Sequence, residues 1–107
     1  MNTATSKFIQ MLRALSDETR FKLVNLLLTH DLCVGALAHR LGISEAAVSQ
    51  HLKQLREVGL VKGEKRGYWT HYAVEKDGLS KLAEALTGMT RRLRRPEGVC
   101  SRKPTKK

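Results

Sequence analysis

Apolar residues recur at intervals of three and four along most of this chain, which is the spacing of amphipathic helices. Residues 8–15 carry the first such pattern. Ser16 or Asp17 then provides an N-cap for a second helix, with Glu18 favourably placed in its first turn. The second helix carries a dense apolar set that we expect in the core, namely Phe21, Leu23, Val24, Leu27 and Leu28.

Two further helices follow a break at residues 30–31 and are joined by a tight turn. The third helix is expected at about residues 34–41, where Gly42 ends it as a left-handed C-cap. Ser44 caps a fourth helix at roughly residues 45–58. Its apolar positions fall on one face and are Ala47, Val48, Leu52 and Leu55. Because the small residue Ala38 lies beneath the turn, the fourth helix is expected to project from the surface, as insertion into a DNA major groove requires.

Two short β-prone runs and a last helix complete the pattern. Residues 60–64 and 68–74 flank Lys65, Arg66 and Gly67, which predicts a two-stranded hairpin, or wing. A final helix at about residues 79–93 carries an apolar stripe that we expect to find part of its burial in a partner chain.

The pattern therefore predicts a mainly α fold with a small β-hairpin, a winged helix-turn-helix of five helices that forms a homodimer. We assign residues 1–95 to this DNA-binding and dimerisation domain. Residues 96–107 are expected to be a disordered basic tail, because Pro96 and Gly98 end the helical pattern.

The distribution of charge changes this picture little, because most of the excess lies near the C-terminal end. The net charge is +10, but residues 1–90 carry 12 Lys/Arg against 9 Asp/Glu, whereas residues 91–107 carry 8 against 1. A basic tail can be a solvated end or can contact phosphates, so it is weak support for a nucleic-acid partner. The longest apolar run, residues 26–28, is far shorter than the ~20 residues of a membrane span, and no signal peptide is visible. We expect a cytoplasmic protein that does not bind membranes.

The polar face of the predicted fourth helix carries side chains of a size that fits a DNA groove. A glutamine can bridge the two hydrogen-bonding groups of an adenine edge, serine can contact a base or a phosphate, and lysine offers a mobile cation. The same face could belong to an ordinary surface helix, but a basic hairpin directly after it favours DNA. The candidate DNA-binding residues are Ser44, Ser49, Gln50, His51, Lys53, Lys65 and Arg66.

Four stretches of the chain together form a specific pattern. They are LSDETR at residues 15–20, DLCV at 31–34, VSQHLKQLR at 48–56, and residues 59–72 from GLV through RG to Tyr72. With them the sequence resembles the ArsR/SmtB family of small bacterial repressors from Phe8 to Leu93. The resemblance implies a winged fold, a homodimer formed by the first and last helices, and repression relieved by an inducer. By position it implies that Ser49, Gln50 and Lys53 face DNA.

The chain contains two cysteines, Cys33 and Cys100, and neither belongs to a CxxC pair. Family members that sense soft metals often carry two cysteines one residue apart, but here the second position is Gly35. Two thiolates from Cys33 and Cys100 could instead bind a soft ion or a trivalent arsenical, or could be oxidised. Alternatively, Cys33 is a small buried residue and Cys100 an incidental thiol. No cofactor is required.

Taken together, these features predict a transcriptional regulator that binds double-stranded DNA with an inverted-repeat operator, most simply a repressor released by a thiol-reactive inducer. One alternative is a winged-helix regulator without a metal site. Another is a basic protein that binds nucleic acids without sequence preference, with a steep salt dependence. A winged fold that contacts other proteins is a third. We do not expect an enzyme, because no nucleophile, base and orienting group recur at a recognisable spacing and there is no glycine-rich phosphate loop.

Overall fold

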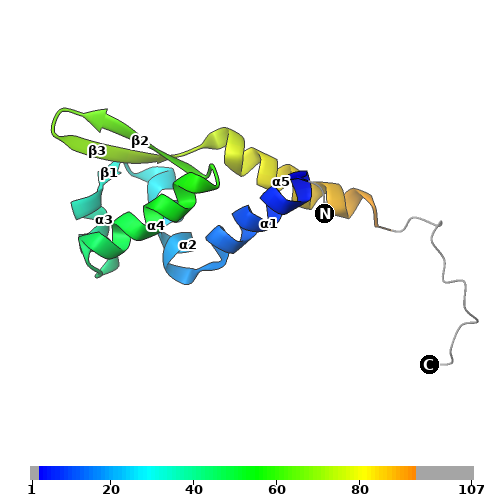
Figure 1. The fold of residues 1–107 in the computed structure, drawn as a ribbon, viewed down its shortest axis with the longest axis horizontal. Coiled ribbons are helices and arrows are strands. Elements are labelled where there is room, and N and C mark those ends of the chain that lie inside the picture. Colours follow the sequence, from blue (N-terminus) through cyan, green and yellow to red (C-terminus); the bar gives the residue numbers. More distant parts are fainter. Residues whose placement is uncertain (1–2, 94–107) are drawn as a thin grey trace, which may run out of the picture.

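A computed structural model describes residues 3–93, which form five helices and a three-stranded antiparallel sheet (Figure 1). In chain order the elements are α1 (Thr3–Ser16), α2 (Glu18–Thr29), β1 (Leu32–Cys33), α3 (Val34–Leu41), α4 (Glu45–Glu57), β2 (Val61–Arg66), β3 (Trp69–Val74) and α5 (Lys76–Arg91). This order confirms the predicted winged helix-turn-helix. The β2–β3 hairpin lies at one end of the described part and the last turns of α5 lie at the other (Figure 1). None of the helices within residues 3–93 is long and apolar enough to cross a membrane.

The boundaries of the helix-turn-helix agree closely with the sequence pattern, and those of the outer helices agree less well. Helix α3 has the predicted bounds, and α4 ends one residue before the predicted position 58. Helix α1 begins at Thr3, ahead of the first apolar repeat at residue 8. Helix α5 begins at Lys76, ahead of the predicted start at residue 79, and includes Gly78. Glycine is a poor helix former, so the sequence pattern left it out, but tertiary packing favours it at this position.

The wing differs from the prediction at its turn. Lys65 and Arg66 belong to strand β2, where they pair with Thr70 and Trp69, and they do not form the turn. The turn consists of residues 67–68, with Gly67 at φ 64°. Two-residue hairpin turns favour glycine at a positive φ because their twist matches that of the strands. Strand β2 therefore continues through Lys65 and Arg66, beyond its predicted end at residue 64.

Strand β1 was not predicted, because two residues are too few to show an alternating pattern. It pairs with β3 through Leu32 opposite Tyr72 and Cys33 opposite His71. The strand order is β1-β3-β2, so the segment between α2 and α3 is joined to the wing. The sheet thus places Cys33 beside both α3 and the hairpin.

Three local signals determine where helices α2, α3 and α4 begin or end. Of the two predicted N-caps for α2, Asp17 is the one used, and its Oδ2 accepts a hydrogen bond from the backbone N–H of Arg20 at 3.0 Å. Gly42 ends α3 in the left-handed region, at φ 69° and ψ 32°, as predicted. Ser44 caps α4 by accepting from the N–H of Ala47 at 3.0 Å. The turn between α3 and α4 is therefore closed by hydrogen bonds on both sides.

A single apolar core joins all five helices to the base of the sheet. No polar or charged side chain is buried within residues 3–93. The buried residues are Met11, Ala14, Leu23, Val24, Leu27, Leu37, Ala38, Val48, Leu52, Leu55, Leu60, Val61 and Leu82. On α4, the three largest residues of the predicted inner face are buried. The exposed fractions of Val48, Leu52 and Leu55 are 0%, 1% and 0%.

Two residues expected in the core are exposed. Phe21 and Leu28 of α2 have exposed fractions of 53% and 52%. The prediction was wrong because the apolar residues of α2 extend around the helix beyond the face that its packed neighbours, α1, α3, α4 and β3, cover. Leu86 and Met89 on α5, and Leu93 just after it, are likewise exposed. The described part of the chain thus leaves apolar surface uncovered on its outer helices.

Helix α5 touches the turn after α4 so closely that only glycine fits at position 78. A Cβ atom at Gly78 would lie 1.9 Å from the backbone oxygen of Gly59. We therefore expect Gly78→Ala to lower the free energy of unfolding by about 1–3 kcal/mol, because backbone on both sides must move to admit a methyl group. Urea unfolding measured at one protein concentration checks this.

Gly88→Ala is the matched control on the same helix. A Cβ atom there would meet nothing nearer than Arg92 Nη1 at 3.8 Å. Since alanine is the better helix former, this variant should gain about 0.5–1 kcal/mol of stability. Equal unfolding free energies for the two variants would contradict the close contact at Gly78.

Candidate nucleic-acid interface

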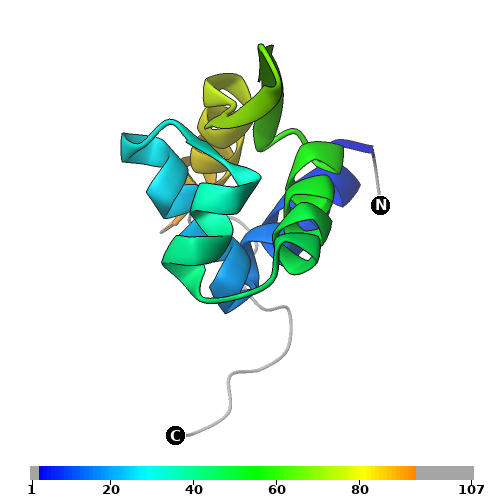
Figure 2. The same ribbon diagram turned by 90° about the vertical axis from the view of Figure 1, so that its left-hand side faces the viewer.

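The turn at Gly42 sets α4 against α3 at a fixed angle, with one face of α4 outward. The N–H groups of Gly42 and Ile43 both donate to the carbonyl oxygen of Ala38, at 2.8 and 3.2 Å. Ala38 is buried beneath them, as the sequence predicted. Seen from the end that carries the wing, α3 and α4 lie beside each other with the turn between them (Figure 2). This arrangement leaves the outer face of α4 accessible to a groove.

The outer face of α4 carries most of the predicted contact residues. Ser49, Gln50 and Lys53 are exposed, on the side of the helix opposite its buried residues. Ser44 is exposed at the N-terminus, where its Oγ accepts from Ala47 and its hydroxyl proton stays available to donate. Helix N-termini favour anions because their first N–H groups are unpaired. The geometry therefore offers groove-sized donors and acceptors on one helical surface.

His51 differs from the other candidates on α4, because it is half-buried and already has a partner. Its Nδ1 atom lies 3.2 Å from Nη1 of Arg20 on α2. The sequence pattern gave His51 as a candidate DNA-binding residue and did not reveal this contact. The two residues are 31 positions apart, and no local signal connects them.

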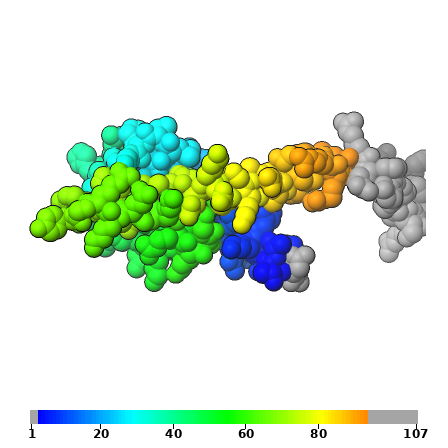
Figure 3. All heavy atoms as spheres, turned by 90° about the horizontal axis from the view of Figure 1, so that it is seen from above, coloured from blue at the N-terminus to red at the C-terminus, as the bar shows by residue number. Residues whose placement is uncertain are grey.

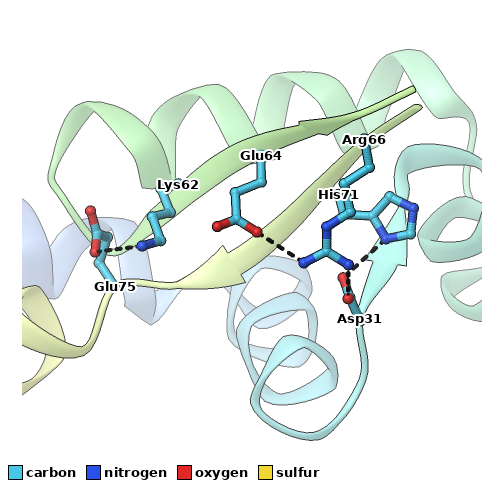
Figure 4. A network of polar contacts seen from close by, with 6 residues as sticks. All are labelled: Asp31, Lys62, Glu64, Arg66, His71 and Glu75. Atoms are coloured by element: carbon cyan, nitrogen blue, oxygen red, sulfur yellow. Dashed lines mark hydrogen bonds and ion pairs between the residues drawn. The ribbon is translucent and has the colours of Figure 1, made fainter. Parts of the chain in front are cut away.

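Arg66, a candidate DNA-binding residue of the wing, is bound to two carboxylates in the protein. Its guanidinium donates to Asp31, in the segment before β1, and to Glu64 Oε1 at 2.9 Å (Figure 4). His71 of β3 lies beside them, with its Nδ1 3.0 Å from Asp31 Oδ1. A carboxylate only accepts hydrogen bonds, so the Nδ1 atom of His71 carries the proton. Arg66 therefore links the wing to the body of the protein.

These contacts shift the pKa values of the acidic groups in one direction. Hydrogen bonds from Arg66 and then from His71 hold the pKa of Asp31 below its ordinary value. Arg66 also lowers the pKa of Glu64, and the two carboxylates raise the pKa of Arg66 in return. Asp31, Glu64 and Arg66 are thus ionised at neutral pH, and a phosphate that binds Arg66 must compete with two carboxylates.

The tip of the wing is basic and aromatic. Lys65 is exposed, and no ion pair with it is found in residues 3–93. Tyr68 and Trp69, which the sequence analysis did not single out, have exposed fractions of 97% and 64%. The hairpin projects beyond the helices at the end of the molecule opposite α5 (Figure 3). Its tip is accessible to a partner that lies against α4.

Cys33 lies where α3, β1 and the wing meet. It occupies the N-cap position of α3, is half-buried, and stands opposite His71 in the sheet. The second candidate ligand, Cys100, lies outside the described residues, as do residues 96–107. Within the described part, no group of three or more metal-ligating side chains comes together. Residues 3–93 of one chain therefore do not supply a three-ligand site at Cys33.

Comparison with known proteins places this geometry in one family. Residues 17–62 match the family model described as bacterial regulatory protein, arsR family. The chain is 34% identical over 86 residues to the transcriptional activator HlyU of Vibrio cholerae, and this alignment covers 80% of each chain. It is 46% identical over 66 residues to the arsenical resistance operon repressor of Escherichia coli, covering 60% of this chain and 56% of that repressor.

A solved structure supports the same conclusion. Reduced HlyU from V. cholerae superposes with a TM-score of 0.66 at 33% identity, and the match covers 79% of this chain and 90% of that one. These relatives are transcription regulators and not enzymes. Fold, helix-turn-helix geometry and sequence identity agree, and the chain belongs to the arsR family of DNA-binding winged helix-turn-helix regulators.

Proposed function

We propose that the protein binds double-stranded DNA as a homodimer at an inverted-repeat operator and represses transcription until a thiol-reactive inducer acts at Cys33. The observation that carries the DNA-binding part is the outer face of α4. There Ser49, Gln50 and Lys53 are exposed while Val48 and Leu52 anchor the helix from the opposite side. A helix held in this way can enter a major groove without losing its packing.

The uncovered apolar surface on the outer helices supports the homodimer. The exposed apolar residues are Leu12 of α1, Leu86 and Met89 of α5, and Leu93 just after α5. The last turns of α5 run clear of α2, α3 and α4, with α1 alongside (Figure 1). A two-fold interface between α1 and α5 of two copies would bury these residues. It would also present two α4 helices to two half-sites.

The position of Cys33 supports a thiol-linked release. A metal, arsenical or disulfide at Cys33 adds bulk at the N-terminus of α3, the helix that packs against α4, and next to His71 of the wing. The similar E. coli protein is named an arsenical resistance repressor, and a HlyU structure is described as reduced. Arsenicals and oxidants both react with thiols. HlyU is named an activator, so a reporter assay with and without the protein tests the sign of regulation.

Gln50→Ala tests whether α4 reads bases. If Gln50 contacts an adenine edge, the variant should bind the operator about 1–3 kcal/mol more weakly and lose its preference at one base pair of each half-site. Fluorescence anisotropy with a set of single-base operator variants measures both effects. Gln10→Ala, on the exposed surface of α1, makes the same chemical change outside the outer face of α4 and should leave the profile unchanged. An unaltered profile for Gln50→Ala would refute the base-reading role.

Arg66→Ala tests whether the wing contacts phosphates. Such a contact carries little sequence information, so the variant should weaken binding to all duplexes alike and lower the slope of log K against log salt by about one. Lys65→Ala, which breaks none of the ion pairs of Arg66, should lower the slope by the same amount. Lost preference for one base without a salt effect would show that Arg66 acts otherwise.

Cys33→Ser tests the inducer site. The variant should bind the operator as the unmodified protein does, because serine is nearly isosteric with cysteine. It should fail to release DNA when phenylarsenoxide, Cd²⁺ or diamide is added, whereas the unmodified protein should lose about 5–150-fold in affinity with the effective agent. Cys100→Ser should fail in the same way if the two thiols act together. A full response from Cys33→Ser would place the site elsewhere.

A further inference from the structure

Arg20 joins the end of α1 and the start of α2 to α4, which lies 31 positions further along the chain. Its Nε donates to the carbonyl oxygen of Ala14 at 2.6 Å, in the last turn of α1. Its backbone N–H donates to Asp17 Oδ2 at 3.0 Å, at the N-cap of α2. Its Nη1 lies 3.2 Å from Nδ1 of His51, in the middle of α4. The guanidinium is thus held from one side by backbone and faces the candidate recognition helix on the other.

The chemistry of this contact determines where His51 carries its proton. A guanidinium is always charged in proteins and has only donors. The Nδ1 atom of His51 must therefore accept, so it is unprotonated. The neutral ring then carries its proton on Nε2, and this nitrogen becomes a donor. Asp17, the nearby acid, has its pKa lowered chiefly by the backbone N–H of Arg20, so its carboxylate stays ionised beside the guanidinium.

The Nε2 atom is the remaining polar atom of this ring. It lies on the side of the imidazole away from Nδ1, and no hydrogen bond to it is found among residues 3–93. His51 stands at the border between the exposed face, with Ser49 and Gln50, and the buried residues Leu52 and Leu55. A helix in a major groove meets base edges along its centre line and the sugar-phosphate backbone at its borders. A donor at this border therefore suits a phosphate oxygen.

We propose that Arg20 is a positioning residue for DNA recognition, which holds His51 as the neutral Nε2–H tautomer so that His51 donates to a DNA phosphate. This inference rests on the proposed contact between α4 and DNA. Arg20 acts through His51 and does not itself touch the nucleic acid. The donor is neutral, so its loss removes a hydrogen bond to DNA but does not change the number of counterions released on binding.

The first test needs no DNA and no variant of Arg20. Long-range ¹H–¹⁵N spectra of the full chain at neutral pH distinguish protonated from unprotonated ring nitrogens, and His51→Asn identifies the signals. We expect a protonated Nε2 and an unprotonated Nδ1 for His51. The opposite tautomer, or a doubly protonated ring, would overturn the proposal whether or not the protein binds DNA.

The second test is a double-mutant cycle on operator binding. Arg20→Ala and His51→Ala should each weaken binding to all duplexes by roughly tenfold, the value of one hydrogen bond to a charged acceptor. The double variant should be no weaker than either single variant. The salt slope should stay unchanged in all three. A slope lowered by about one in Arg20→Ala would mean that the guanidinium itself contacts a phosphate, which contradicts the proposal.

Arg20→Lys provides a second variant, since removal of the whole side chain also frees the carbonyl of Ala14. The single ammonium of lysine cannot donate both to the carbonyl of Ala14 and to Nδ1 of His51, as Nε and Nη1 of Arg20 do. Lysine should therefore restore stability more than it restores operator affinity. Full recovery of affinity together with a mixed tautomer of His51 would overturn the proposal. Gln50→Ala, measured in parallel, reports on α4 independently of Arg20. If neither Gln50→Ala nor His51→Ala alters binding while the tautomer is as expected, the DNA contact of α4 fails and not the tautomer assignment.

Discussion

The left-handed turn at Gly42 is the constraint on which the remaining geometry depends. An L-residue with a side chain pays strain at φ 69°, so glycine allows α3 to end and α4 to begin within three residues. The carbonyl of Ala38 accepts both N–H groups of that turn, and Ser44 caps the next helix. Helix α4 is therefore oriented by backbone hydrogen bonds at one end and by Val48, Leu52 and Leu55 along its length. These fixed contacts leave its opposite face free to bind DNA.

Local signals were sufficient to predict the helix-turn-helix, and they failed where packing decided the outcome. Gly42 and Ser44 act through neighbouring backbone groups, so their effect is visible in sequence. The start of α5 depends on the close contact between Gly78 and Gly59, which no local pattern contains. Likewise, Phe21 is apolar and was expected in the core, but about half of its surface is left uncovered by the described part of the chain.

The candidate site shows the same division between local and long-range information. Periodicity along α4 predicted that Ser49, Gln50 and Lys53 would be exposed, and they are. The contacts that hold the site together join residues 31 and 35 positions apart, from Arg20 to His51 and from Asp31 to Arg66. Their side chains are polar and either exposed or half-buried, so they do not contribute to the periodic pattern of apolar residues in the sequence. The family match, over residues 17–62, includes both Arg20 and His51 but ends before Arg66.

The central claim is that a rigidly oriented α4 reads sequence from the major groove. Selection of binding sites from a random duplex pool, followed by interference from methylation at guanine N7, tests it directly, because N7 lies in the major groove. If α4 reads base edges, one inverted repeat should be enriched, with half-sites about 34–36 Å apart or a multiple of this, and with interference within both half-sites. A pool that stays random while the protein binds tightly at low salt would contradict it, and would instead indicate nonspecific attraction by basic residues.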